Sequence, residues 1–431
     1  MENFFPMCQR DSYCKRIEAE VISCEPHKSQ QSQGGKKGKK GGNNGNGSEA
    51  TLYDVILSDT VLFAEAGGQP CDYGTVGGHV CKSVRVGSAG NVHVHTIDGP
   101  LAVGARIVVE VDWARRFEHM QQHTSQHILT AIAAQEYGVR TVGWALHEDR
   151  TIVEFEDPTG AAVTPEFIEK LECAANESIR DARAVYATVY AADAVPEDIR
   201  SRGAIPTDGS PIRVVTVTGV DSATCCGTHV ANTADLQAIK VVGTERARQG
   251  TIRLAFLAGE KVLRAMGAQS ARERAIGKLL CCQAEVFAAR IGGLMDENAA
   301  LAKQRKRLIA DIAALDAEAL CARLGKEGEG AAKTVEHHRC SVGMEYLEAL
   351  VAAIAEKRPD ATAGTLFVLT ASEGPAAEGP GAFLIVGPAD AVQAAGKVAR
   401  EVLSGKGGGK GGKFQGKTDH MEKRAELVAK L

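Results

Sequence analysis

Residues 113–138 read WARRFEHMQQHTSQHILTAIAAQEYG, and this stretch decides how the rest of the chain is divided. Its apolar side chains recur at the spacing of one helix face, at Met120, Ile128, Leu129 and Ile132. Gly138 closes the pattern with a residue that commonly ends a helix. Before this stretch the sequence alternates as strands do, and after it strand-like and helical patterns are mixed. The sequence therefore predicts a helix that joins a β domain to an α+β domain.

Two histidines of this predicted helix, His123 and His127, lie four residues apart. Side chains at that spacing project from one helix face, which is the geometry that two ligands of one metal ion need. An HxxxH pair alone is more often two surface or interface histidines than a metal site. Thr124 rather than glutamate follows His123, so the general base of the zinc proteases is missing. The pair becomes a candidate metal site only if further ligands exist.

Further ligands are offered by DSATCCGTHVAN at residues 221–232, where Cys225 and His229 are again four apart. Three histidines and one cysteine give four nitrogen and sulfur ligands, the number and softness of a tetrahedral zinc site. The alternative is a buried thiol beside a capping histidine. Cys226 could also replace Cys225 as the ligand. We prefer Cys225, because only it reproduces the i, i+4 spacing to His229.

The first 112 residues predict a small β-barrel or sandwich, because short strand-like bursts alternate with glycine turns. The expected strands are residues 15–28, 51–64, 75–86, 91–97 and 101–112. From Gly34 to Gly47 every residue is Gly, Lys or Asn, a composition with no apolar surface to offset chain entropy. We therefore expect a disordered basic insertion at about residues 29–49.

The remaining chain predicts three further parts, so the expected class is a multidomain α+β protein. Residues 113–259 form an α+β domain with a second helix over 164–182, and residues 326–431 form a C-terminal α/β domain. The expected elements of that last domain are strands at 365–372 and 381–388 and a helix at 390–404. Residues 260–325 are helical, and a heptad of leucines favours a hairpin or short coiled coil there, with homodimerisation through it. The heptad leucines are Leu294, Leu301, Leu308 and Leu315.

A glycine-rich segment, LFAEAGGQPCDYG at residues 62–74, contains Gly67, Gly68 and Gln69. A glycine hairpin between strands is the simplest interpretation. Glycines also let a ligand approach the main chain closely, which is the functional interpretation. The spacing does not match dinucleotide-binding or P-loop motifs, so phosphate binding of that type is not expected.

A second glycine-rich segment lies near the end of the chain. Six of the nine residues from 405 to 413 are Gly, and the other three are Lys406, Lys410 and Lys413. A solvated flexible tail is one interpretation. The other is an RNA contact, because clustered lysines suit a phosphate backbone and the neighbouring Phe414 suits an exposed base.

Composition limits the class of protein. The chain has 431 residues and a formal net charge of -4, so a histone-like basic binder is excluded. No window approaches eighteen uncharged apolar residues, and Glu2 and Asp11 stand where a signal peptide has no acidic residues. The twelve cysteines are irregularly spaced, which does not suggest a disulfide framework. We expect a soluble protein of the cytoplasm.

Six segments in this order resemble the freestanding alanyl-tRNA editing proteins of the AlaX type, most of all their long eukaryotic form. The resemblance spans nearly the whole chain, and its segments are CQRDSY (8–13), FAEAGGQPCDYG (63–74), VDWARRFEHMQQHTSQH (111–127), IRVVTVTGVDSATCCGTHV (212–230), DLQAIKVVGTE (235–245) and GKGGGKGGKFQGK (405–417). It implies a trans-editing aminoacyl-tRNA deacylase, an ester hydrolase that removes serine wrongly attached to tRNA(Ala). Nothing resembles the aminoacylation and ATP-binding half of alanyl-tRNA synthetase, so a synthetase is excluded.

The resemblance also implies the cofactor and the partner. One Zn2+ ion is expected in a domain similar to the editing domain of the synthetase, with four ligands: His123, His127, Cys225 and His229. A DHHA-like tRNA-binding domain is expected after the helical linker, with Lys406, Lys410 and Lys413 contacting tRNA. The expected partner is mischarged tRNA(Ala), with neither DNA nor a membrane. The alternative is a catalytically silent zinc-containing module that binds tRNA or associates with chaperones.

Roles around the metal follow from the chemistry of ester hydrolysis. Zinc could lower the pKa of a bound water or could orient the substrate, and we favour orientation because four protein ligands leave little room for a hydroxide. Gln69 and the backbone of Gly67 and Gly68 would then help to place water. A site that hydrogen-bonds a hydroxyl rejects a substrate that lacks one. The candidates for that contact are Thr124, Gln126 and Thr141.

Three positions differ from the pattern of the resembling family. Gln126 stands where relatives in the synthetase have Thr before the second ligand histidine, Cys226 stands where the CGGTH pattern has Gly, and Ala66 replaces a glycine. Trp144 either walls the pocket or belongs to the core.

Overall fold

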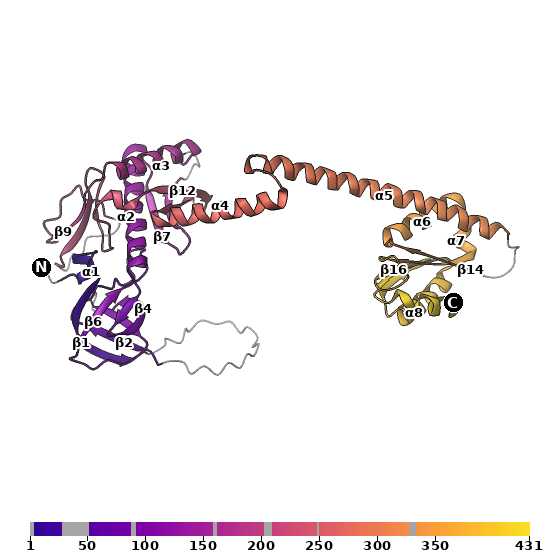
Figure 1. Ribbon diagram of the computed structural model, residues 1–431, viewed down its shortest axis with the longest axis horizontal. Helices are drawn as coiled ribbons and strands as arrows, with labels where there is room; N and C mark the ends of the chain where they lie inside the picture. Colours follow the sequence, from indigo (N-terminus) through magenta and orange to yellow (C-terminus); the bar gives the residue numbers. More distant parts are fainter. Residues whose placement is uncertain are drawn as a thin grey trace. The chain divides into compact units, whose positions relative to one another are not determined.

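The computed structural model describes residues 4–27, 51–87, 92–157, 162–201, 209–247, 250–326 and 333–431. The chain divides into two compact units, Met1–Arg274 and Ala275–Leu431, which are described separately (Figure 1). The basic insertion predicted at residues 29–49 lies outside the described residues. In the parts of the chain that the structure describes, no helix combines the length and apolarity needed to cross a membrane.

A closed six-stranded barrel follows the short helix α1 (Met7–Arg10), with the strand order β1-β2-β5-β4-β3-β6. Its strands are β1 (Arg16–Pro26), β2 (Tyr53–Leu57), β3 (Gly74–Val76), β4 (His79–Val86), β5 (His93–Ile97) and β6 (Arg106–Val111). Alternating side chains fill the interior, among them Val21, Val55, Val84 and Val109. The barrel confirms the small β domain, although the domain boundaries stay predictions.

The strand predicted over residues 51–64 is wrong in length, because β2 ends at Leu57. The chain turns at Asp59, whose carboxylate accepts hydrogen bonds from the backbone N–H groups of Met7 and Thr60 at 2.8 Å. A side chain that satisfies backbone donors in this way competes with strand pairing. Residues beyond this turn form the loop that carries the Gly67–Gly68 segment.

Helix α2 (Trp113–Tyr137) lies at the centre of the first unit (Figure 1). The Asp112 side chain caps it by accepting from the N–H of Arg115, and Gly138 ends it at a φ of 65°. Every residue from His119 to Ala133 is buried, polar and apolar alike. Other elements therefore surround this helix, and its buried polar side chains need hydrogen-bond partners.

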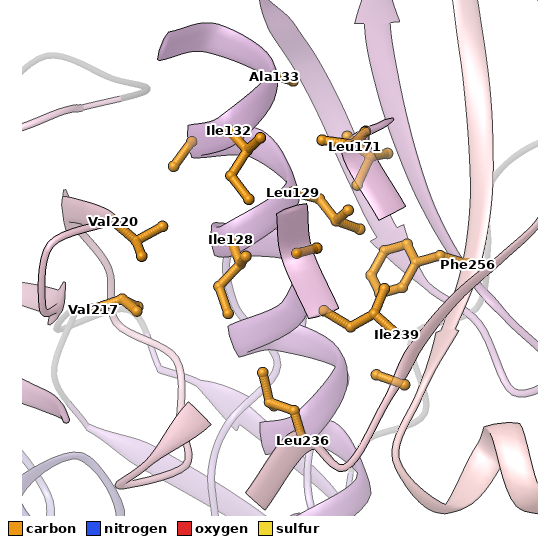
Figure 2. Close-up of a cluster of buried hydrophobic side chains, with 14 of the residues drawn as sticks. Ile128, Leu129, Ile132, Ala133, Leu171, Val217, Val220, Leu236, Ile239 and Phe256 are labelled. Carbon is orange, nitrogen blue, oxygen red and sulfur yellow. The ribbon is translucent and has the colours of Figure 1, made fainter. Parts of the chain in front are cut away.

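Two sheets and one helix pack around α2. A four-stranded sheet has the order β12-β13-β8-β7, and a three-stranded sheet has the order β11-β10-β9. The elements are β7 (Thr141–Leu146), β8 (Thr151–Glu156), α3 (Pro165–Arg180), β9 (Val185–Tyr190), β10 (Ile212–Val217), β11 (Asp221–Thr224), η1 (Thr233–Leu236), β12 (Ile239–Arg246) and β13 (Thr251–Ala258). Figure 2 shows the shared core, where Leu129 of α2 lies with Leu171 of α3 and Phe256 of β13. The predicted α+β arrangement is present.

The second unit is a five-stranded sheet with helices, in the strand order β14-β15-β16-β18-β17. The unit boundary falls within α4 (Glu260–Leu280), and a short turn, η2 (Ala284–Val286), precedes the 40-residue helix α5 (Phe287–Lys326). The other elements are β14 (Lys333–Cys340), α6 (Met344–Lys357), α7 (Ala361–Gly364), β15 (Thr365–Ser372), β16 (Gly381–Val386), α8 (Ala389–Val402), β17 (Lys406–Lys410), β18 (Lys413–Thr418), η3 (Met421–Lys423) and α9 (Arg424–Ala429). β14 pairs with β15 in parallel, and the other neighbours are antiparallel.

Helix α5 packs on this sheet through residues other than its heptad leucines. Ala313, Ala317 and Leu320 are buried in one cluster with Tyr346 and Leu350 of α6. The heptad leucines are instead between 38% and 68% exposed: Leu294, Leu301, Leu308 and Leu315. The predicted leucine stripe is present on the helix, and homodimerisation through it stays a prediction.

Two features of the second unit differ from the sequence interpretation. Strand β14 and helix α6 were not among the predicted elements. The interpretation of residues 405–413 as a flexible tail is wrong, because β17 and β18 form an antiparallel hairpin at the sheet edge. Its glycines are needed for close approach, since a Cβ on Gly409 would lie 2.0 Å from the carbonyl oxygen of Lys413.

Candidate functional site

Four side chains from two distant segments meet at one point in the first unit. His123 and His127 come from α2, and Cys225 and His229 come from the loop after β11, here called the ligand loop (residues 225–229). Their ligand atoms all lie within 4.8 Å of one another. The Cys225 Sγ is 3.4 Å from Nε2 of His123 and 3.2 Å from Nε2 of His229. The structure thus brings together the set that the two i, i+4 spacings predicted.

Each imidazole is held by a hydrogen bond at its other nitrogen. Nδ1 of His123 donates to Oε1 of Gln69 at 2.8 Å, and Nδ1 of His127 donates to Oδ2 of Asp221 at 3.1 Å. Nδ1 of His229 is hydrogen-bonded to the hydroxyl of Thr124 at 3.1 Å. Such partners fix ring orientation and tautomer in metal sites, and leave Nε2 as the ligand atom.

The donor set fits a metal ion such as zinc. Zinc bonds of about 2.3 Å to sulfur and about 2.0 Å to nitrogen place tetrahedral ligands about 3.6 Å apart, near the sulfur–nitrogen distances found here. Burial lowers the pKa of His229 well below its ordinary value, and His123 and His127 lower it further. A neutral imidazole is the form that ligates a metal. The cluster could therefore hold a metal ion.

The ligand loop is held from behind by Arg213 and Gln9. The buried Arg213 donates from Nη1 to the carbonyls of Cys225 and Gly227, at 2.8 and 2.9 Å, and from Nε to the carbonyl of Gln9. The Gln9 side chain donates in turn to the carbonyl of Cys226 at 2.7 Å. Gly227 has no room for a side chain, because a Cβ there would lie 2.2 Å from Cε1 of His123. The loop conformation thus depends on the N-terminal segment and on a glycine.

The Gly67–Gly68 segment forms a tight turn that delivers Gln69 to the cluster. Both glycines have positive φ, 60° and 91°, and Ala66 and Gln69 exchange backbone hydrogen bonds across them. The Gln69 amide then donates to the hydroxyl of Thr228 at 2.9 Å and accepts from its N–H at 3.1 Å. Gln69 therefore connects the turn, helix α2 and the ligand loop.

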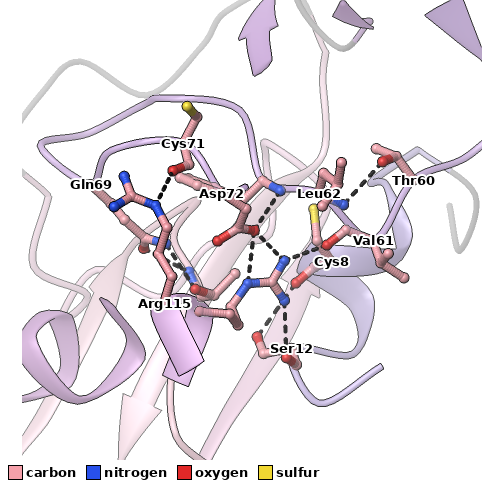
Figure 3. Close-up of polar contacts among 12 residues, drawn as sticks. Cys8, Ser12, Thr60, Val61, Leu62, Gln69, Cys71, Asp72 and Arg115 are labelled. Atoms are coloured by element: carbon pink, nitrogen blue, oxygen red, sulfur yellow. Dashed lines mark hydrogen bonds and ion pairs between the residues drawn. The ribbon is translucent and has the colours of Figure 1, made fainter. Parts of the chain in front are cut away.

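A buried ion pair between Asp72 and Arg116 fixes this loop against α2. Both side chains are 0% exposed, and Arg116 also donates to the carbonyls of Val61 and Ser12. Asp72 additionally accepts from the N–H of Phe63 at 2.7 Å. Figure 3 shows the carboxylate of Asp72 joined by dashed lines into this network, which extends through the guanidinium to Val61 and Ser12. The pair joins three chain segments on which the site depends.

A pocket of about 160 Å³ opens beside the cluster. Its lining residues are Gly67, His123, Gln126, His127, Trp144, Arg200, Ala223, Thr224, Cys225 and Cys226. The ring of Trp144 lies 4.5 Å from that of His123, so Trp144 walls the pocket while also packing on the core. This volume is below the range of pockets for drug-sized ligands, about 300 to 1,000 Å³, and suits a group as small as an aminoacyl moiety.

The two adjacent cysteines have different places. Only Cys225 belongs to the cluster. Cys226 lines the pocket, and its sulfur lies 3.5 Å from where a Cβ of Gly67 would be. Burial raises the pKa of the Cys226 thiol above its ordinary value. The geometry therefore favours Cys225 as the ligand, as the spacing did.

The other predicted site residues fall into three places. Gln126 and Gly67 line the pocket, whereas Gln69 and Thr124 stand behind ligand histidines as hydrogen-bond partners. Gly68 packs under Trp144, and Thr141 donates to the hydroxyl of Thr130 and is not among the pocket-lining residues. Lys406, Lys410 and Lys413 belong to the hairpin of the second unit. Contact of any of these residues with a substrate stays a prediction.

Three functional positions were missed by the sequence interpretation: Asp221, Arg200 and Arg213. Asp221 stands four residues before Cys225, and its acidic side chain beside a ligand motif was the available signal. Arg213 lies in the apolar run IRVVTV, where a charged residue facing the core signals a buried polar contact. Nothing in the sequence around Arg200 indicates its role, because a β-bridge to the distant Ala223 in β11 determines its position.

Part of the chain matches a known protein family, and the chain as a whole is similar to known proteins. Residues 212–255 match the family described as "Threonyl and Alanyl tRNA synthetase second additional domain". The chain is 38% identical to the alanyl-tRNA editing protein Aarsd1 of Mus musculus over 428 residues, which cover 99% of this chain and 97% of that protein. Aarsd1 of Danio rerio is 34% identical over 425 residues, 98% of this chain and 96% of that protein.

A more distant relative is the alanine–tRNA ligase of Ignicoccus hospitalis. It is 27% identical over 391 residues, which cover 88% of this chain and 40% of the ligase. The similarity to the two editing proteins therefore extends along both units, whereas most of the ligase has no counterpart in the match.

Proposed function

Because this chain belongs to the family of alanyl-tRNA editing proteins, we propose that it is an aminoacyl-tRNA deacylase that hydrolyses the ester of serine on mischarged tRNA(Ala). The proposal includes one zinc ion held by His123, His127, Cys225 and His229. The observation that carries it is the convergence of these four side chains, with all three imidazoles oriented, beside a pocket of aminoacyl size. Zinc bound there would supply a Lewis acid that polarises or orients the substrate.

The chain's own residues would bind and orient the aminoacyl group. Gln126 is buried at the pocket wall, and its amide nitrogen donates to the hydroxyl of Thr130 at 2.7 Å. Its Oε1 is then the acceptor that can meet the side-chain hydroxyl of the substrate. Serine carries that hydroxyl and alanine does not, so a site built this way favours serine. Trp144 and Gly67 form part of the pocket wall.

Acid–base chemistry has a restricted set of contributors. No aspartate or glutamate is among the pocket-lining residues that the structure describes. Asp221 is the nearest carboxylate to the ligands, and it is engaged by His127 and Arg200. Burial would raise the pKa of Asp221, but these two hydrogen-bonding partners lower it below its ordinary value. Asp221 is therefore an ionised group that holds His127, and the substrate's own hydroxyl groups would help to place water.

The proposed activity is tested by following ester loss from Ser-tRNA(Ala) and Ala-tRNA(Ala) with zinc-loaded protein. We expect Ser-tRNA(Ala) to be deacylated at least about 100-fold faster, because the pocket's polar group is left unpaired by alanine. Intact Ser-tRNA(Ala) after incubation with fully loaded protein would support the silent tRNA-binding module instead. Equal rates on both substrates would contradict the proposed role of Gln126 in selecting serine over alanine.

We also propose that the β17–β18 hairpin of the second unit binds tRNA phosphates. Lys406 pairs in register with Lys417, and Lys410 pairs with Lys413, so like charges stand opposite each other across the hairpin. Like charges directly opposite are destabilising unless an anion lies between them. Lys406, Lys410 and Lys413 are exposed, and Lys413 also pairs with Glu348 at 3.5 Å. The glycines between the lysines leave the backbone accessible. This arrangement suits a phosphate backbone.

Replacing Lys406, Lys410 and Lys413 together by glutamine should weaken tRNA binding and reduce its salt dependence by about 2 to 3 in log–log slope. The measurement is tRNA affinity across a range of salt concentrations. Deleting residues 405–431 would be a poor test, because Phe414, Met421 and Leu427 are buried in the second unit. Lys303→Gln, Lys306→Gln and Arg307→Gln on α5 form a matched variant of equal charge. Equal losses in both would indicate net charge rather than the hairpin.

Homodimerisation through α5 and a cytoplasmic location remain predictions. The four exposed leucines of α5 give the first a physical basis, since a stripe of that kind can pair with a second helix. Sedimentation of the full chain at several concentrations measures the oligomeric state directly.

A further inference from the structure

Arg200 lines the pocket, and the function proposed above uses it only as a partner of Asp221. Its backbone is fixed to β11, because its N–H donates to Ser222 at 2.9 Å and its carbonyl accepts from Thr224 at 3.0 Å. Its side chain is 29% exposed, unlike the nearly buried ligand His127. Apart from the ligand side chains, it is the one charged residue among the described residues that line this pocket. It therefore places a fixed positive charge where the pocket meets solvent.

The guanidinium of Arg200 has one edge occupied and another available. Nε and Nη2 both donate to the carboxylate of Asp221, with Nε 3.1 Å from Oδ1. Asp221 also accepts from Nδ1 of His127, so it fixes the guanidinium relative to the metal cluster. Nη1 makes no hydrogen bond within the described parts of the chain. The edge formed by Nη1 and Nη2 can therefore hold two oxygens of a second anion, a geometry that suits arginine better than lysine.

The chemistry of the substrate identifies an anion for that edge. An aminoacyl ester on the terminal ribose places the aminoacyl group in the pocket, and the nearest negative charge on the same nucleotide is its 5′-phosphate. We propose that Arg200 binds the phosphate of the 3′-terminal nucleotide through its Nη1–Nη2 edge. This inference rests on the proposed function and adds a recognition element to it.

The contact would solve a problem of selectivity. A pocket of about 160 Å³ that recognised the aminoacyl group alone would also admit free serine. A phosphate contact at the pocket opening makes productive binding depend on the nucleotide as well. Asp221 links Arg200 to His127, so the phosphate contact would lie at a fixed place beside the cluster. Arg200 would thus act as a binding residue.

The test compares adenosine 5′-monophosphate with adenosine as ligands of the zinc-loaded full chain. Trp113 and Trp144 are the two tryptophans of the chain, and Trp144 walls the pocket, so fluorescence can report binding. Trp144→Phe identifies the part of the signal that comes from the pocket. The wild-type protein should bind the monophosphate about tenfold more tightly than adenosine, and Arg200→Met should abolish that preference. Zinc is kept in excess so that every variant is loaded.

The ratio of the two affinities separates phosphate binding from a structural role. Loss of structure would weaken both ligands equally, whereas loss of the contact weakens the monophosphate alone. Arg253→Met is the matched control, because Arg253 pairs with Glu154 on the neighbouring strand and does not line the pocket. An unchanged preference in Arg200→Met overturns the proposal. If Arg200→Met does not load zinc, Arg200→Lys is used in its place. We expect this variant to prefer the monophosphate over adenosine less than the wild type does. An unchanged preference would contradict a contact made by two donors.

Deacylation provides a second measurement. Arg200→Met should raise KM for Ser-tRNA(Ala) about tenfold and leave kcat within about twofold, since a phosphate contact is made equally in the ground state and the transition state. A fall in kcat at unchanged KM would overturn the proposal and place Arg200 at the reacting carbonyl. If no deacylation occurs at all, the proposed function fails, and the nucleotide preference still tests Arg200 independently.

Discussion

Alanine at Cys225 is expected to empty the metal centre and to abolish deacylation of Ser-tRNA(Ala). Cys225 supplies the sulfur of the cluster that could hold a metal ion, with its Sγ within 3.4 Å of two histidine nitrogens. Loss of a residue that only hydrogen-bonds a metal ligand lowers metal affinity about 10 to 100-fold. Loss of a ligand itself should therefore lower it more than about 100-fold. Metal content per chain and kcat/KM should fall together. His123→Ala should behave in the same way.

Cys226→Ala is the matched control for metal content. Its thiol is adjacent in sequence and lines the pocket, but it lies outside the cluster. This variant should retain one metal ion per chain. Retention by Cys225→Ala with loss by Cys226→Ala would reverse the ligand assignment. Full deacylation by a metal-free double variant of His123 and Cys225 would remove zinc from the proposed function.

Replacing Arg116 by methionine is expected to produce the largest loss of stability in the first unit. The substitution leaves the carboxylate of Asp72 buried at 0% exposure without its cation. Breaking a buried pair in this way costs about 3 to 5 kcal/mol of unfolding free energy. Trp113 and Trp144 both lie in the first unit, so tryptophan fluorescence during denaturation reports on that unit alone.

The exposed pair Arg140–Glu156 supplies the control for this experiment. Arg140→Met should leave the denaturation midpoint unchanged, because water screens the charges of an exposed pair. The double variant Asp72→Leu with Arg116→Met should recover part of the lost stability, since neither charge is then buried alone. A loss in Arg116→Met no greater than in Arg140→Met would show that the ion pair is not a determinant of the fold.

The sequence could predict those parts of the protein that depend on local periodicity. The helix beginning at Trp113 and its two histidines follow from a 3.6-residue repeat, and the barrel follows from strands separated by turns. The cluster was predictable because its two ligand pairs each have i, i+4 spacing. These signals each lie within a short stretch of sequence, so they can be recognised without knowledge of the fold.

The remaining site could not be predicted because it depends on contacts between distant segments. Gln69 was expected to help place water and Thr124 to contact the substrate, and the sequence did not show that both are hydrogen-bonded to histidines of the cluster, one of them across 54 residues. Arg213 reaches Gln9 across 204 residues. The β17–β18 hairpin could not be predicted for another reason. Its glycine-rich sequence has a low propensity for strands, and it is ordered by the pairing of β18 with β16.

The separation of the ligand pairs along the chain has a consequence for synthesis of the protein. His123 and Cys225 are 102 residues apart, so a ribosome making about 5 to 20 residues per second completes the second pair about 5 to 20 s after the first. During that interval the nascent chain offers only two imidazoles, which bind zinc far less tightly than four ligands. For the proposed zinc site, metal capture would therefore be a late event in biogenesis, and a chain truncated between the two pairs should leave the ribosome without metal.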